Sequence, residues 1–285
     1  MTFRELTIGS ALRAIRHVAP SDRFLWPAAR IALAKRDGRG TESLLPTADG
    51  FQMRLRLGQY PDGAMYFGVF EVQTIRLIKS ILKPGDRAVD VGANIGYMTL
   101  HMAKRVGATG EVHSFEPVPG NRARLEQALV DNHFGFVRVH SEALGEKSDK
   151  TLIYDFSAST AGHAESSLRP LHENATALPC DVVRMDDVID GPVRLIKVDV
   201  EGAEVGVLRG ATRVIRENKP HLIVENNPKT LQAFGVTFAD VYEAIRSAHD
   251  GYDAILLTAF SPKLSVQDLK ADTLPAANVW FRPRV

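Results

Sequence analysis

The sequence predicts an α/β fold with a doubly wound, mostly parallel sheet. Short apolar segments alternate with helical segments over most of the chain, which is typical of parallel strands whose crossover helices cover both faces. Two strand-like segments close the chain without a helix between them, so we expect a hairpin with one antiparallel strand at or near an edge. At 285 residues and 45% hydrophobic content, the chain is long enough for one large domain with an added segment.

Seven strands are expected in the main sheet, and helical periodicity separates most of them. The strand-like segments are residues 87–91, 111–116, 136–144, 193–200 and 221–225, followed by DAILLTAF and ANVWFRP. The helical segments are residues 97–106, 119–132 and 202–217, then VTFADVYEAIRSAHD. Ahead of the first strand, FQMRLRL alternates as a strand does and VFEVQTIRLIKSIL has helical periodicity. A polar section with the strand-like segments TLIYDF and DVVRM lies between the third and fourth strands.

Residues 1–45 are expected to form a helical extension ahead of a main domain at residues 46–285. The extension is rich in arginine and lysine and has apolar residues near helical spacing, so the simplest interpretation is an amphipathic helix docked on the domain. Contact with a membrane surface, a partner or another copy of the chain is the alternative. Neither a segment long enough to cross a bilayer nor a secretory signal is found, so we expect a cytoplasmic protein.

The charge and cysteine content narrow the function classes. Lysine plus arginine number 35 against 34 acidic residues, so the net charge of +1 provides no general attraction for nucleic acid. We therefore expect a small-molecule substrate and no nucleic-acid partner. The single cysteine, Cys180, excludes a disulfide framework and a cysteine-based zinc site.

The first predicted strand ends in the turn DVGANIG, which opens a helix. Gly92 and Gly96 permit a tight turn, and the free N–H groups of the helix terminus face any bound anion. Asn94 takes the place of the middle glycine of the dinucleotide motif G-x-G-x-x-G, so a pyrophosphate fits poorly. S-adenosylmethionine, which carries a carboxylate instead of phosphates, fits better. Asp90 is then an acceptor that fixes the turn or receives a ligand amine or hydroxyl.

The next two strand ends supply the remaining contacts of a nucleoside. Glu116 ends the second strand, where an acidic residue accepts hydrogen bonds from ribose hydroxyls in nucleotide-binding α/β domains. After the third strand, Glu142 and Ala143 lie where an adenine ring would rest. A solvated loop charge is the alternative for Glu142.

The motifs, taken in order, resemble the FkbM-type family of S-adenosylmethionine-dependent methyltransferases. They are DVGANIGYMTL, HSFEPVPGNRARLEQAL, SEALGE, IKVDVEGAEVGVLRGA and KPHLIVE. The resemblance implies a class I methyltransferase fold, which is Rossmann-like, and O-methylation of a sugar, polyketide or other secondary metabolite. By position it places Asp90, Gly92, Asn94 and Gly96 on the methionine side of the cofactor, Glu116 at the ribose, and Glu142 and Ala143 at the adenine. Glu71 would contact the methionyl amino group.

Carboxylates after the fourth and fifth strands are the catalytic candidates. A hydroxyl nucleophile benefits from losing its proton, to a base or with the help of a metal ion. Asp199 also belongs to the expected cofactor contacts, and either Asp199 or Glu201 is a candidate general base. Alternatively, Asp199, Glu225 and Asn226 hold Mg²⁺, which prefers such oxygen ligands. Helix capping explains Glu204, and it competes with catalysis as the explanation of Glu201.

Three further interpretations remain open. His163 lies in the polar connection after the third strand and is an alternative base, although a surface histidine is the simpler interpretation. A nicotinamide-dependent oxidoreductase on the same sheet would need a G-x-G-x-x-G turn or a Tyr-x-x-x-Lys pair, and the sequence has neither. The third is a non-catalytic domain that keeps the cofactor pocket and acts through a protein partner.

Overall fold

The computed structural model describes residues 42–57, 59–155, 166–169, 175–258, 260–271 and 273–284. The predictions for the N-terminal extension therefore lie almost wholly outside the described residues, and the boundary at residue 45 stays a prediction. Strand β1 (Ser43–Pro46) spans that position and pairs with β2 (Gln52–Leu55). This pair is tied to the main domain by the Gln52 N–H, which donates to the side-chain carbonyl of Asn132 at 2.9 Å.

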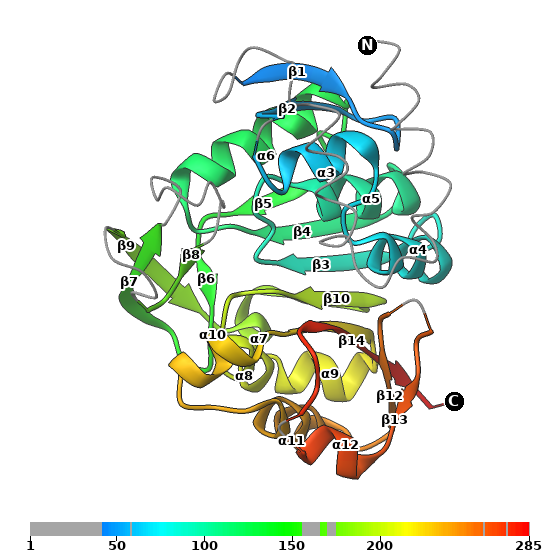
Figure 1. Ribbon diagram of the computed structural model, residues 1–285, viewed down its shortest axis with the longest axis vertical. Coiled ribbons are helices and arrows are strands. Elements are labelled where there is room, and N and C mark those ends of the chain that lie inside the picture. Colours follow the sequence, from blue (N-terminus) through cyan, green and yellow to red (C-terminus); the bar gives the residue numbers. More distant parts are fainter. Residues whose placement is uncertain are drawn as a thin grey trace.

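A central eight-stranded sheet runs through the molecule in the order β13-β12-β14-β11-β10-β3-β4-β5 (Figure 1). Five neighbouring strands, β11, β10, β3, β4 and β5, pair in parallel, and β12 runs in the same direction. β14 is antiparallel to both of its neighbours, β11 and β12, and β13 is antiparallel to β12. The mostly parallel, doubly wound α/β fold is thus confirmed. The bounds are β3 (Arg87–Val91), β4 (Glu111–Phe115), β5 (Arg138–His140), β10 (Leu195–Val198), β11 (His221–Asn226), β12 (Tyr252–Leu256), β13 (Lys263–Leu264) and β14 (Ala277–Pro283).

The C-terminal part of the sheet differs from the prediction. The sheet has eight strands instead of seven because the two-residue β13 adds to the outer edge of β12. The closing strands are not a simple hairpin either, since β13 and α12 (Val266–Lys270) lie between them. The antiparallel strand β14 consequently returns between β11 and β12 and lies third from that edge.

Alternation along the strands sends side chains to two separate cores. Ala88, Leu195 and Ile223 pack with α4 (Val72–Ile81), α5 (Tyr97–Val106) and α6 (Pro119–Asp131) on one face. Val89, Ile196 and Leu222 pack on the opposite face with α8 (Glu204–Arg209), α9 (Thr212–Asn218) and α11 (Phe238–Ala248). Burial on both faces explains why the strands are almost continuously apolar.

Two predicted elements are divided in the structure. The segment at 136–144 forms β5 and then β6 (Ala143–Leu144), which leaves the main sheet to join a second one. That second sheet has the order β6-β9-β7-β8, with β7 (Asp149–Asp155), β8 (Ser166–Ser167) and β9 (Thr176–Val183). The predicted helix 202–217 is split into α8 and α9 at Gly210, where a Cβ would lie 1.9 Å from the carbonyl oxygen of Gly145.

Four short helices complete the described part of the fold. They are α3 (Asp62–Phe67), α7 (Met185–Val188), α10 (Pro228–Ala233) and the α12 already given. Among the helices in the described ranges, none has the length and apolar character needed to cross a bilayer.

Candidate functional site

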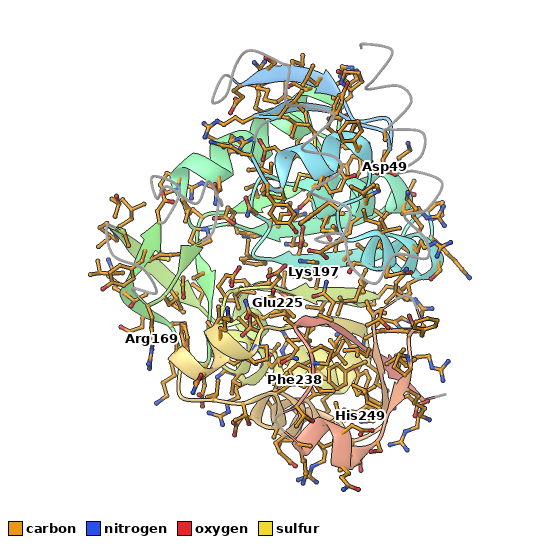
Figure 2. All side chains as sticks on the ribbon, in the orientation of Figure 1. Asp49, Arg169, Lys197, Glu225, Phe238 and His249 are labelled. Atoms are coloured by element: carbon orange, nitrogen blue, oxygen red, sulfur yellow. The ribbon has the colours of Figure 1, made fainter. Side chains whose placement is uncertain are left out.

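A pocket of about 780 Å³ opens at the carboxyl ends of β3, β4, β10 and β11. Strand alternation explains its polar lining. Asp90, Lys197 and Glu225 follow Ala88, Leu195 and Ile223 by two residues and so point to the same face of the sheet. Figure 2 shows Lys197 and Glu225 close to the centre of the molecule. The pocket therefore lies where ligands bind in open α/β sheets.

The turn between β3 and α5 forms one wall of the pocket. Gly92 has a φ of 79°, and a Cβ there would lie 1.8 Å from the backbone oxygen of Asp199, so only glycine fits. Asn94 is also left-handed, with a φ of 51°. Gly96 has a φ of 90°, and a Cβ there would lie 2.5 Å from Leu125, so this glycine permits helix packing and does not line the pocket.

Asp90 is a fully buried carboxyl group in the pocket lining. Its Oδ2 accepts a hydrogen bond from the Thr99 hydroxyl at 2.6 Å, whereas Oδ1 has no hydrogen-bond partner among the described residues. Burial raises the pKa of Asp90, an effect that the nearby Lys197 opposes. An unsatisfied buried oxygen is costly, so Oδ1 is a natural acceptor for a ligand amine or hydroxyl.

Glu116 lies at the end of β4 and also lines the pocket. Its two carboxylate oxygens accept hydrogen bonds from the N–H groups of Asn94 at 2.8 Å and Val118 at 3.0 Å. Burial raises the pKa of Glu116 to about 7, although both hydrogen bonds act in the opposite direction. Phe115, Ala143 and Leu144 form an apolar part of the pocket wall. Glu142, which was predicted to lie at the adenine, is not among the lining residues.

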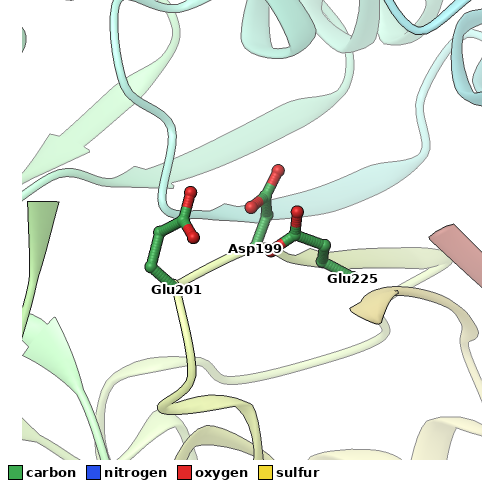
Figure 3. Close-up of side chains that lie close together, drawn as sticks. All are labelled: Asp199, Glu201 and Glu225. Atoms are coloured by element: carbon green, nitrogen blue, oxygen red, sulfur yellow. The ribbon is translucent and has the colours of Figure 1, made fainter. Parts of the chain in front are cut away.

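Three carboxyl groups meet beside this wall, and we call Asp199, Glu201 and Glu225 the carboxylate trio (Figure 3). One oxygen from each lies within 4.8 Å of the others. Glu201 has a left-handed φ of 52°, and its Oε2 lies 3.5 Å from the Asn227 amide nitrogen. Burial, and then the charges of its two partners, raises the pKa of Glu225 well above its ordinary value. The geometry is compatible with a shared proton or with a hard cation.

Asn226 does not join this group, contrary to the predicted metal-ligand set. As the neighbour of Glu225 in β11, it points to the opposite face of the sheet. Its amide donates to the carbonyl oxygens of Leu274 at 3.3 Å and Pro275 at 2.9 Å. Glu201 takes its place beside Asp199 and Glu225.

Lys197 is a pocket residue that the sequence interpretation missed. Its ammonium lies 2.6 Å from Oδ2 of Asp199, and its side chain is 3% exposed. Burial lowers the pKa of Lys197, but the carboxylates of Asp199, Glu71 and Asp90 outweigh this and raise it on balance. The signal was present in IKVDV, where a lysine two residues before Asp199 interrupts an apolar strand on the same face.

The other predicted site residues have identifiable positions. Glu71 is the N-cap residue that precedes α4 and has a φ of 41°. It lines the pocket and accepts a hydrogen bond from the Asn278 amide at 2.8 Å. Glu204 is buried, and its Oε1 accepts from the N–H groups of Val200 and Gly202, both at 3.2 Å. It thereby anchors the loop that carries Glu201, in agreement with a structural role. His163 lies outside the described residues.

Comparisons of this sequence with known proteins all match methyltransferases. The family described as "Methyltransferase FkbM domain" matches residues 90–253. "Methyltransferase 1" of Beauveria bassiana is 32% identical over 143 residues, which cover 43% of this chain and 57% of that protein. "31-O-demethyl-FK506 methyltransferase FkbM" of Streptomyces tacrolimicus is 30% identical over 159 residues, covering 45% and 60%. The matched region thus spans somewhat over half the length of these curated relatives.

A solved structure of an FkbM methyltransferase is also among the matches. The crystal structure of methyltransferase FkbM from Methylobacillus flagellatus superposes with a TM-score of 0.46 at 18% sequence identity. The superposition covers 77% of this chain and 65% of that one.

Proposed function

This chain belongs to the FkbM methyltransferase family, and on that premise we propose that it transfers a methyl group from S-adenosylmethionine to a hydroxyl of a small molecule. The observation that carries the proposal is the continuity of one pocket. It joins the β3–α5 turn and Glu116 to the carboxylate trio. A donor held at the turn would therefore lie beside groups able to receive a proton. Neither a nicotinamide-dependent oxidoreductase nor a non-catalytic domain is favoured by the family match.

The residues present fit this cofactor. Asp90 has a buried oxygen without a partner among the described residues, which suits an ammonium or hydroxyl donor. Glu116 has carboxylate lone pairs beyond the two backbone hydrogen bonds and is suited to the ribose hydroxyls. Phe115, Ala143 and Leu144 form an apolar wall suited to a flat ring. When bound, S-adenosylmethionine supplies a methyl group activated by its sulfonium.

The carboxylate trio would orient the acceptor and receive its proton. Methyl transfer is an in-line displacement, so holding the acceptor oxygen in line with the methyl group accounts for much of the barrier reduction. The ammonium of Lys197 pairs with Asp199 at 2.6 Å and so holds that carboxyl group in place. Asp199 or Glu201 then accepts the hydrogen bond of the acceptor hydroxyl, and the proton is shared within the trio.

A divalent cation at the trio is the second candidate arrangement, with Glu201 replacing Asn226 in the ligand set. We favour the shared proton because the ammonium of Lys197 already lies 2.6 Å from Asp199. An assay with EDTA, once an acceptor is known, separates the two: retained turnover supports the proton, and loss restored by Mg²⁺ supports the metal.

Calorimetry with S-adenosylhomocysteine tests the proposed cofactor. We expect binding in the micromolar range, weakened at least tenfold by Asp90→Ala and by Glu116→Ala because each removes a buried acceptor. Glu243→Ala, a change on α11 outside the pocket lining, is the control and should bind normally. Absence of binding at high micromolar concentration, or equal binding by all variants, would refute the proposal.

A further inference from the structure

The turn that carries Glu201 has a backbone conformation that depends on its surroundings. Glu201 has a left-handed φ of 52°, and Gly202 follows with a φ of 107°. The left-handed region is strained for a residue with a side chain and persists only where the surrounding structure imposes it. The Glu201 carboxylate therefore keeps its place in the trio only if neighbouring segments hold this turn.

One support of the turn comes from β8 of the second sheet. The hydroxyl of Ser167 donates to the backbone oxygen of Glu201 at 3.1 Å, and Ser167 is 1% exposed. The same hydroxyl oxygen accepts a hydrogen bond from the N–H of Arg169 at 3.3 Å. Ser167 thus binds the strained turn and is itself held by the residue that follows β8 by two positions.

A second support comes from α10, which packs against Gly202. A Cβ on Gly202 would lie 2.5 Å from the ring of Phe234 and 2.6 Å from the backbone oxygen of Thr230. The amide nitrogen of Asn227, the residue before α10, lies 3.5 Å from Oε2 of Glu201. This helix and the residues that flank it therefore restrict both the backbone of the turn and the Glu201 carboxylate.

Arg169 joins the two supports. Its guanidinium donates to the backbone oxygen of Ala233 at 2.7 Å and lies 4.8 Å from the centre of the Phe234 ring. A cation over an aromatic face at this distance is attracted to it. Figure 2 shows Arg169 between the second sheet and α10. Ser167, Arg169 and Phe234, which we call the Glu201 clamp, therefore hold the turn from two sides.

We propose that Ser167 and Arg169 are positioning residues that hold the Glu201 carboxylate within the trio, facing the methyl group of the donor. The inference rests on the proposed function and adds that the second sheet controls part of the geometry of the trio. Arg169 is not among the lining residues of the pocket, so its effect on a bound molecule passes through the turn.

Sinefungin provides a readout that needs no acceptor. This analogue carries an ammonium group where S-adenosylmethionine carries its methyl group, whereas S-adenosylhomocysteine has only an uncharged sulfur there. A carboxylate held at the point of transfer therefore favours sinefungin. Calorimetry of the full chain with both compounds gives the ratio of their dissociation constants. We expect the wild type to prefer sinefungin by about tenfold or more.

Substitutions in the clamp should reduce this preference without changing the binding of S-adenosylhomocysteine. Arg169→Ala should reduce it about fivefold or more, because the Glu201 carboxylate is no longer held at the point of transfer. Loss of a positive side chain would by charge alone favour the cationic analogue, so a decrease identifies positioning. Arg169→Lys keeps a cation and a donor and should retain most of the preference. Ser167→Ala should act in the same direction as Arg169→Ala.

Arg282→Ala is the matched control. The Arg282 guanidinium also lies over an aromatic ring, 5.7 Å from the centre of Trp280, but it belongs to β14 and is outside the pocket lining. This variant should keep the wild-type preference for sinefungin.

A double substitution shows whether Arg169 acts through Glu201. Glu201→Gln should also lower the preference for sinefungin, and Arg169→Ala should add little to it, since effects that pass through one group are not additive. The inference would be overturned by a wild type without the preference, by an unchanged preference in Arg169→Ala or Glu201→Gln, by an equal loss in Arg282→Ala, or by additive losses. Failure of the wild type to bind S-adenosylhomocysteine would instead refute the proposed function.

Discussion

Three carboxyl groups near the pocket differ in what surrounds them. Asp199 is paired with the ammonium of Lys197, whereas Glu225 is buried beside other acids, and burial raises its pKa. Glu204 is buried too, but its Oε1 accepts two backbone N–H groups of the loop. The three acids therefore differ in their surroundings: Asp199 is paired with an ammonium, Glu225 has a raised pKa, and Glu204 anchors a loop.

Glu204 makes stability depend on pH. Burial raises its pKa from 4.5 to about 7, against the effect of its backbone hydrogen bonds. A raised carboxyl pKa stabilises the fold below the unfolded pKa, and this contribution is lost as pH rises through the folded pKa. The free energy of unfolding should therefore fall between pH 5 and pH 8, by up to about 3 kcal/mol from this group.

Glu204→Gln tests that dependence by urea denaturation at pH 5.5 and pH 8. The amide oxygen keeps the role of Oε1, and the amide nitrogen replaces Oε2, which has no hydrogen-bond partner among the described residues. We expect a smaller loss of stability with rising pH than in the wild type. Glu217→Gln, on the exposed side of α9, should keep the wild-type profile. Parallel pH profiles for Glu204→Gln and the wild type would contradict the assignment.

At the scale of elements, the site depends on close approach between the β3–α5 turn and the end of β10. Gly92 places its Cα against the backbone oxygen of Asp199, and the Asp199 N–H donates to the carbonyl of Val91 at 3.0 Å. The turn and the residue that leads into the trio are therefore one packed unit. A substitution in the β3–α5 turn should therefore displace the backbone of Asp199.

Gly92→Ala tests this unit. A Cβ at 1.8 Å from a backbone oxygen forces the strands apart, so we expect a loss of more than about 3 kcal/mol of unfolding free energy. Gly235→Ala is the matched control, since Gly235 has a positive φ of 73° but no atom within 4 Å of the added Cβ. It should cost only about 1 kcal/mol of backbone strain. Urea denaturation of both variants compares their unfolding free energies. Equal losses would show that the positive φ, and not the contact with Asp199, causes the destabilisation.

At the scale of the whole molecule, the pocket is assembled from both ends of the described chain. Asn278 in β14 donates to Oε2 of Glu71 at 2.8 Å and to the hydroxyl of Thr74 at 2.9 Å. This contact joins the C-terminal antiparallel strand to the start of α4. The segment that carries Glu71 is thereby held over the carboxyl ends of the central strands.

Asn278→Ala should loosen this connection. We expect a loss of about 1–3 kcal/mol of unfolding free energy, because one of the hydrogen bonds is to a carboxylate, and severalfold weaker binding of S-adenosylhomocysteine. Asn218→Ala is the control. Asn218 donates to the carbonyl of Val214 within its own helix at 3.0 Å, so its removal should leave ligand binding unchanged. Calorimetry and denaturation of both variants make the comparison. Unchanged ligand binding in Asn278→Ala would contradict a role of the β14–α4 hydrogen bonds in shaping the pocket.

Patterns within single segments were enough to predict much of this protein. The alternation of apolar strands and helices predicted the α/β class, and the ordered motifs from DVGANIG to KPHLIVE predicted the family that the comparison confirms. Asp90, Glu116 and Glu201 were found because polar residues at the ends of buried strands are exceptional. The opposite directions of Glu225 and Asn226 were also available from strand alternation, but the prediction did not use them.

Only the tertiary structure decided which of these groups meet. The expected strand order already predicted that Glu225 lies near Asp199, but sequence spacing does not show that Glu201 completes the group in place of Asn226. Nor does it show that Lys197 pairs with Asp199 rather than with a ligand. It does not show that β6 leaves the main sheet or that β14 returns between β11 and β12. Local periodicity is set by neighbours along one segment, whereas the pocket depends on the register of separate strands and on backbone contacts such as that of Gly92 with Asp199, which form only when distant segments pack together.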